Sequence, residues 1–162
     1  MVEASADNKN DYELSPEEQL LVTKHLGEGT YIVDKKRKST VVLSREQADW
    51  RKSVIQEVEY DFALALQKGD YFLGNAVINF YLTREIKDSD PPLFINSQAL
   101  AVASLTINDR PAELSPESFQ NQVIPLRPKD VVQGWNTVQL RYLTPYNKNR
   151  VGLHTFTDSA DQ

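Results

Sequence analysis

Apolar and polar residues alternate with a period of two through the middle of the chain, and this pattern predicts two paired strands. Alternation of this kind places successive side chains on opposite faces of a strand. The first apolar series, which we expect to belong to a half-buried strand, consists of Val58, Tyr60, Phe62, Leu64 and Leu66. The second series, expected to form the inner face of the return strand, consists of Phe72, Gly74, Ala76, Ile78, Phe80 and Leu82. The turn residues Lys68-Gly69-Asp70 lie between them, so the two strands should form a long β-hairpin.

Shorter strands are expected on the carboxyl-terminal side of this hairpin. They are Leu93–Ile95, Val102–Ile107 and a last strand built on Val138, Leu140 and Tyr142. A turn is expected at Asn108–Pro111 and another at Gln133–Asn136, and Pro128-Lys129-Asp130 suggests a helical turn. Short strands separated by Gly, Pro and Asn turns are typical of an antiparallel sandwich or a curved sheet.

Two short helices are predicted before the strands. Ser15-Pro16-Glu17-Glu18 has the sequence of a capping box with proline at the first helical position, and glycines at 27 and 29 should end that helix. Ser44 and Gln47 repeat the capping pattern for a helix that reaches about Ser53, in which Trp50 is expected to anchor packing. The polar residues 2–11 show no periodicity, which is typical of disorder.

Composition and charge exclude several classes of function. The 162 residues fit one domain, with 40% hydrophobic and 25% charged residues. A net charge of -5 does not provide the basic surface that nucleic-acid binding needs. The basic run Lys35–Lys38 is short enough to be a solvated loop. The absence of cysteine rules out disulfides and thiolate sites. No apolar stretch approaches the ~20 residues that cross a bilayer, and the acidic start does not resemble a secretory leader. We therefore expect an intracellular, cytoplasmic protein without membrane insertion, with an organelle as the alternative compartment.

The sequence offers little material for catalysis. Zinc hydrolases place two histidines on one helix face, as in H-E-x-x-H, whereas this chain has only His25 and His154, far apart. His25 lies near a predicted helix carboxyl end, which favours a cation, and a shared metal site with a carboxylate is the minority alternative. Glu57, Glu59 and Asp61 alternate along a strand and are interpreted as its wet face. We predict no catalytic, cofactor-binding or metal-ligating residue in this chain.

Several segments, in order and spacing, resemble the front domain of the aminopeptidase N family of zinc metallopeptidases. Leu43-Ser44-Arg45-Glu46-Gln47-Ala48 leading into Val58-Glu59-Tyr60-Asp61-Phe62-Ala63-Leu64 is similar to that domain's opening helix and strand. The later matching segments are Gly69-Asp70 with Phe72 and Ala76–Leu82, Leu93-Phe94-Ile95, Ser104–Asn108, Gly134–Val138, and Tyr146 with Val151–Asp158. Asn96-Ser97-Gln98 and Asn108-Asp109-Arg110 depart from the family pattern.

The resemblance implies a mostly β fold, a saddle-like antiparallel β-sandwich over residues 43–162 that lacks the domain's final strands. The short N-terminal helical arm, expected from the capping pattern as an extension with one helix over residues 1–42, lies outside the matching segments. In this family a separate catalytic domain holds the zinc and the glutamate base. None of the family's functional residues matches a position in this chain, so no cofactor is expected here.

Three functions remain open at this point. The first is a non-catalytic N-terminal domain that supports removal of N-terminal amino acids only within a parent enzyme. The second is a standalone, enzymatically inactive relative that acts as a structural or interaction subunit of a larger assembly. Both imply a protein partner, either a catalytic domain in cis or other subunits. The third, an unrelated carbohydrate- or peptide-binding sandwich, would require exposed aromatic residues clustered on one sheet face.

Overall fold

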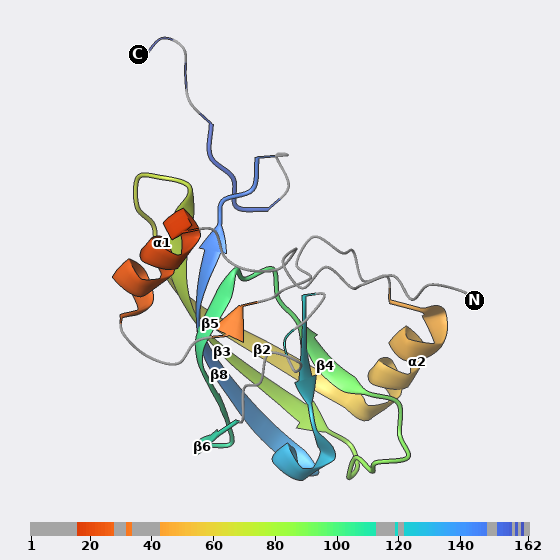
Figure 1. Ribbon diagram of the computed structural model, residues 1–162. Coiled ribbons are helices and arrows are strands. Elements are labelled where there is room, and N and C mark those ends of the chain that lie inside the picture. The colour runs from red at the N-terminus through yellow and green to blue at the C-terminus, as the bar shows by residue number, and fades with distance from the viewer. Residues whose placement is uncertain are drawn as a thin grey trace, which may run out of the picture.

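The protein is a mostly β molecule in a computed structural model (Figure 1), which describes residues 16–27, 32–33, 43–112, 119, 122–148, 152–156, 158 and 160. The helical elements are α1 (Pro16–Leu26), α2 (Arg45–Val54) and the 3-10 turn η1 (Pro128–Asp130). The strands are β1 (Ile32–Val33), β2 (Ile55–Ala65), β3 (Tyr71–Leu82), β4 (Leu93–Asn96), β5 (Ala101–Ile107), β6 (Arg110–Pro111), β7 (Val123–Leu126) and β8 (Gly134–Pro145).

The strands form two antiparallel sheets. The main sheet has the order β1-β5-β8-β3-β2, and β6 pairs with β5 beside this path. The second sheet consists of β4 and β7 and lies across one face of the main sheet (Figure 1). This arrangement confirms the expected mostly β, saddle-like antiparallel sandwich with a short N-terminal helical arm.

The long hairpin forms as the alternation predicts. Strands β2 and β3 pair antiparallel, with Tyr60 opposite Ile78 and Phe62 opposite Ala76. The connection bends at residues 68–70, where Gly69 has φ +132°, a conformation that only glycine adopts without strain. On its other side β3 pairs with β8 along its whole length, with Ile78 opposite Val138. The last long strand of the chain therefore lies between β5 and β3 and leaves β2 at the edge.

The main core lies between the main sheet and the two-stranded sheet. Alternate residues of β3, β5 and β8 face it, and β4 and β7 contribute from the other layer. Its members include Ile78, Phe80, Leu82, Leu105, Ile107, Val138, Leu140, Leu93, Ile124 and Leu126. Every inner-face residue predicted for β3, from Phe72 to Leu82, is buried. Trp50 packs against the same cluster, as expected of a packing anchor.

A smaller cluster forms on the opposite face of the main sheet. Val22 of α1 is fully buried there with Leu100, Ala101 and Leu143. Leu143 neighbours Tyr142 in β8 and so points away from the main core. The helical arm is therefore a packed part of the domain, anchored through its apolar residues.

The capping box of α2 is present as predicted. The backbone N–H of Gln47 donates to Ser44 Oγ over 3.2 Å, and the backbone N–H of Ser44 donates to Gln47 Oε1 over 3.1 Å. The helix ends at Val54, where the chain enters β2 directly. The predicted cap Ser15, residues 2–11 and the basic run Lys35–Lys38 lie outside the described residues.

The turn predicted at Gln133–Asn136 is wrong in its extent, because β8 begins at Gly134. Asn136 is 1% exposed within this strand and opposite Phe80. Its side-chain oxygen accepts hydrogen bonds from the Val132 backbone and from Asn108 Nδ2, and its Nδ2 donates to the carbonyls of Val132 and Gly134. A buried amide is tolerated there because its hydrogen-bonding capacity is filled.

A candidate binding groove beside strand β2

The apolar residues of β2 are exposed, and the prediction that this strand is half-buried is wrong. Val58 is 44% exposed, Tyr60 62%, Phe62 54% and Leu64 43%, although they share a sheet face with the buried residues of β3. The reason is the width of the covering layer. The second sheet is only two strands wide, and its core residues pack on β3, β5 and β8. We call the side of β2 formed by Val58, Tyr60, Phe62 and Leu64 the β2 face.

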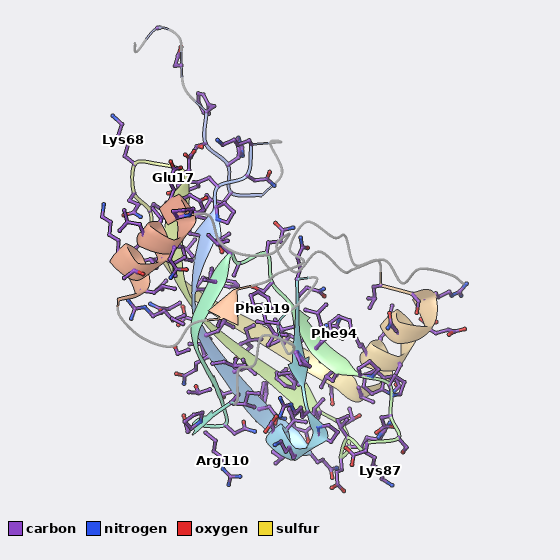
Figure 2. All side chains as sticks on the ribbon, in the orientation of Figure 1. Glu17, Lys68, Lys87, Phe94, Arg110 and Phe119 are labelled. Atoms are coloured by element: carbon purple, nitrogen blue, oxygen red, sulfur yellow. The ribbon has the colours of Figure 1, made fainter. Side chains whose placement is uncertain are left out.

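A groove of about 400 Å³ opens beside the β2 face. The inner faces of β2, β3 and β8 line one side of it, and β4 with the following residues Ser97–Ala99 lines the other. Phe94 of β4, labelled in Figure 2, is buried and lies under the guanidinium of Arg51 at 4.6 Å from the ring centroid. That cation–π contact joins the last turn of α2 to the β4 wall. The groove is therefore a gap between the two layers, mostly apolar and open to solvent.

Two aromatic rings stand at the open side of the groove. Tyr60 and Phe62 are two residues apart on β2, their ring centroids lie 5.7 Å apart, and their planes differ by 8°. Stacked rings on a strand present a flat apolar surface to an approaching molecule. Exposed aromatic residues gathered on one sheet face are the feature expected of a carbohydrate- or peptide-binding sandwich.

The floor of the groove is shaped by the close approach of Gly74 and Tyr142. These residues are directly opposite each other in β3 and β8. A Cβ atom on residue 74 would overlap the ring of Tyr142, so the glycine leaves room for the ring to lie over β3. Burial raises the pKa of the Tyr142 phenol above its ordinary value, because desolvation disfavours the phenolate. Tyr142 therefore contributes a neutral phenol to the groove.

Tyr146 holds the hairpin turn at the end of the groove. Its hydroxyl donates to the carbonyl of Gln67 over 3.1 Å and accepts from the backbone N–H of Gln67 over 3.2 Å. Its ring lies 5.0 Å from that of Phe72, and both side chains are buried. This end of β2 is thus fixed to the body of the sheet.

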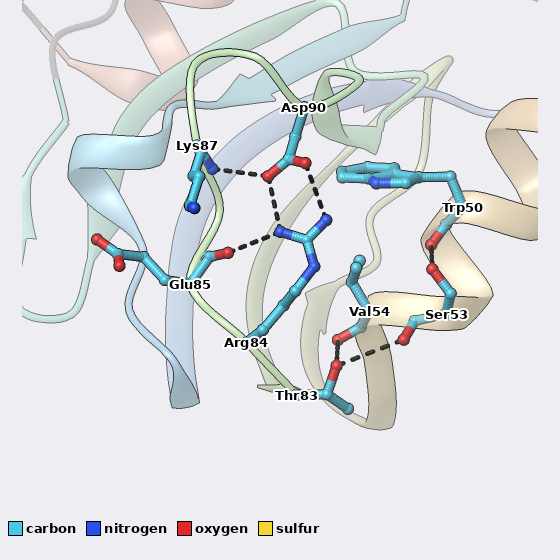
Figure 3. Close-up of polar contacts among 8 residues, drawn as sticks. All are labelled: Trp50, Ser53, Val54, Thr83, Arg84, Glu85, Lys87 and Asp90. Atoms are coloured by element: carbon cyan, nitrogen blue, oxygen red, sulfur yellow. Dashed lines mark hydrogen bonds and ion pairs between the residues drawn. The ribbon is translucent and has the colours of Figure 1, made fainter.

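The loop that follows β3 is closed by an ion pair. Arg84 donates hydrogen bonds from Nη1 and Nη2 to the two carboxylate oxygens of Asp90, each over 2.8 Å, and the backbone N–H of Lys87 donates to Asp90 over 2.7 Å (Figure 3). The Arg84 hydrogen bonds, followed by that from Lys87, lower the pKa of Asp90 to about 2. Just before this bracket, the Thr83 hydroxyl donates to the backbone carbonyls of Ser53 and Val54, which joins the start of the loop to α2 (Figure 3).

Of the titratable residues considered from the sequence, only Glu57, Glu59 and Asp61 lie together in the described part of the chain, along the outer side of β2. His154 is exposed, with Nδ1 3.1 Å from the carbonyl oxygen of Gly152. His25 lies in the last turn of α1, and its side chain is outside the described set. Glu57, Glu59 and Asp61 are exposed on the outer side of β2. Among the residues described, no group of three or more His, Cys, Asp or Glu side chains is placed to hold a metal ion.

Sequence reasoning identified every residue of the β2 face but assigned them to a half-buried strand. The groove itself was missed, because it depends on the order of strands and on the width of the second layer. Within the described ranges, none of the helices has the length and apolar character needed to span a membrane.

No protein-family model matches this chain, and a search of curated proteins found no match to it.

Proposed function

We propose that this chain is a non-catalytic protein-binding domain whose β2 face docks another protein unit. The observation that carries the proposal is the row of four apolar side chains, each at least 43% exposed, of which Val58, Tyr60 and Phe62 line an open groove. Contiguous exposed apolar surface of this kind marks interaction sites in soluble proteins. Its removal from water favours association by about 25 cal/mol per Å² of apolar area.

The resemblance to the aminopeptidase N front domain gives this docking a context. In a parent enzyme the docked unit would be the zinc-bearing catalytic domain, and the present chain would supply architecture and part of the entry wall. The alternative is a standalone, inactive relative that docks other subunits of an assembly. Both versions assign the β2 face the same task and require no chemistry from this chain.

A protein segment suits the β2 face better than a carbohydrate does. Sugars are held by aromatic platforms together with polar groups that hydrogen-bond their hydroxyls. The neighbours of Tyr60 and Phe62 along the β2 face are Val58 and Leu64, which are apolar, and the polar side chains of Asn96, Ser97 and Gln98 lie on the opposite wall of the groove. A peptide can use this apolar row and also pair with the backbone of the strand.

Site-specific crosslinking tests the proposal. A photo-crosslinking phenylalanine derivative replaces Phe62, the chain is expressed in its source cells, and the crosslinked peptides are identified by mass spectrometry. We expect one dominant protein adduct that excess unlabelled chain competes away. The matched control places the same residue at Asn75, which is exposed on the outer face of β3. Equal adduct patterns from positions 62 and 75, or competition by soluble oligosaccharides, would contradict protein docking.

A second measurement addresses the absence of catalysis. The purified chain should bind no stoichiometric zinc and should cleave no aminoacyl-anilide. Metal analysis by mass spectrometry and a chromogenic assay measure these two properties. Stoichiometric zinc or turnover above that of a heat-denatured sample would overturn the non-catalytic assignment.

A further inference from the structure

We propose that the free edge of β2 accepts an extended partner segment in which apolar residues alternate with lysine or arginine, adding one strand to the main sheet. This inference rests on the proposed function and specifies the chemistry of its partner. The same four apolar residues and the acidic residues between them carry it.

The backbone of β2 is available for strand addition. In the described part of the chain β2 pairs with β3 alone and stands last in the sheet order. Every second residue of an edge strand points its N–H and C=O away from the sheet, where they can pair with another strand. Strand β2 has 11 residues, whereas β4, which also borders the groove, has four. The longer ladder makes β2 the favoured edge.

The inner side of β2 specifies apolar partner residues. Side chains directly opposite each other on paired strands lie about 4.5–5.5 Å apart, so an added strand would place alternate residues against Val58, Tyr60, Phe62 and Leu64. Aromatic and β-branched residues form favourable cross-strand pairs. The partner should therefore carry apolar, preferably β-branched, residues at every second position.

The outer side of β2 specifies positive charge. Glu57, Glu59 and Asp61 occupy the alternate positions and are all exposed. Opposite charges across paired strands are favourable, and like charges directly opposite are unfavourable. Three acidic positions in succession thus select lysine or arginine at the intervening positions of the partner.

The same charges act against a second copy of this chain as the occupant. If two β2 strands overlap antiparallel along their whole length, Tyr60 faces Tyr60 and Glu59 faces Asp61 of the other copy. By symmetry that like-charge pair occurs twice. Electrostatic complementarity therefore favours a basic partner over self-pairing.

A synthetic peptide tests the proposed chemistry directly. The probe is capped at both ends, alternates lysine with valine, and matches the 11 residues of β2. Its matched control has the same composition with the lysines and valines in separate blocks. A third peptide replaces the lysines with glutamate. Affinity is measured by isothermal titration calorimetry at low salt, because screening weakens exposed charge pairs.

We expect the alternating lysine peptide to bind at least about tenfold more tightly than either control peptide. Amide hydrogen exchange should show new protection at alternate residues of β2, those whose N–H points away from β3. Equal affinity for the alternating and block peptides would mean attraction by charge alone and would overturn strand addition. So would binding without new protection in β2.

A second test reverses the charge of acidic residues on the protein. The double variant Glu59→Lys/Asp61→Lys should weaken binding of the lysine peptide by about tenfold or more and improve binding of the glutamate peptide. The control Glu85→Lys/Asp88→Lys changes the net charge equally at exposed positions in the loop after β3. If both double variants weaken binding equally, the proposal is wrong, because only the net charge matters.

The remaining outcomes separate this inference from the proposed function. If no peptide binds but the protein crosslink at position 62 is still found, the docking proposal is supported and strand addition is wrong. If the adduct is also missing, both fall. If analytical ultracentrifugation shows a dimer of the chain that Phe62→Asp abolishes, a second copy occupies the face and the basic partner is wrong.

Discussion

Strands β2 and β3 are consecutive, antiparallel and equally alternating, yet one buries its apolar residues and the other exposes them. On the shared inner face, Phe80 of β3 is 4% exposed and Phe62 of β2 is 54% exposed. The difference comes from their neighbours. Strand β3 has β2 on one side and β8 on the other, and the two-stranded sheet packs above it, whereas β2 is at the edge beyond that cover. Alternation therefore reports which side chains share a face, and coverage by a second layer decides whether that face is core or binding surface.

The largest expected effect comes from removing the same ring on each strand. Phe80→Ala should lower the free energy of unfolding by about 3–5 kcal/mol, because it leaves a cavity in the packed core. Phe62→Ala should change it by less than about 1 kcal/mol, because its ring already contacts water. Chemical denaturation of both variants measures the difference.

Phe80→Leu provides a milder core variant if Phe80→Ala does not fold. It should still lower the free energy of unfolding by more than Phe62→Ala does. A cost for Phe62→Ala as large as that for Phe80→Ala would show that the β2 face is covered in the isolated chain. That result would remove the basis of the docking proposal.

A smaller effect is expected at Gly74 of β3, which has the exposed strand β2 on one side and the core strand β8 on the other. The variant Gly74→Ala places a methyl group into the space of the Tyr142 ring and should destabilise the domain by about 1–3 kcal/mol. In a Tyr142→Ala background the obstruction is gone. The same Gly74→Ala change should then stabilise by about 0.4–1 kcal/mol, because alanine restricts the unfolded chain.

The result that tests this contact is a change of sign: Gly74→Ala should destabilise the wild type and stabilise the Tyr142→Ala variant. A double-mutant cycle from denaturant unfolding of the four proteins gives the coupling energy. Equal effects of Gly74→Ala in both backgrounds would show that the Tyr142 ring does not lie over β3 in solution. The floor of the groove would then differ from the one described above.

Local features of the fold could be predicted because their causes lie within a few residues. The capping box needs only Ser44 and Gln47, the hairpin needs the alternation and the glycine turn, and the inner face of β3 follows from its period of two. The extent of β8 was misjudged because Gly134 and Asn136 are typical turn residues. Asn136 is accommodated in a strand by bonds to Val132 and Asn108, and the second of these is distant in sequence.

The groove could not be predicted because it is a property of strand order. Nothing local in the β2 sequence shows that β8 pairs with β3 and leaves β2 at the edge, or that the second sheet stops at β4. The acids at 57, 59 and 61 indicated one wet side of the strand. The exposure of Tyr60 and Phe62 required the arrangement of both layers.

The smallest expected effect concerns the loop after β3, at the end of the hairpin opposite to its turn, where Arg84 and Asp90 form a bracket. The pKa of Asp90 is lowered to about 2 from an ordinary value of 3.8, so the folded state binds its proton less readily than the unfolded chain does. The pair therefore stabilises the fold fully above about pH 4, and this contribution is lost as the pH falls through about 2.

The free energies of unfolding of the wild type and of Asp90→Asn should differ at neutral pH and converge in acid. The variant Asp61→Asn, at an exposed site on β2, is the control for the loss of one carboxylate elsewhere on the surface. An Asp90→Asn profile parallel to that of the wild type down to about pH 2 would show that the bracket contributes nothing in solution. The loop would then be held by its other contacts, such as the hydrogen bonds of the Thr83 hydroxyl to the backbone carbonyls of Ser53 and Val54.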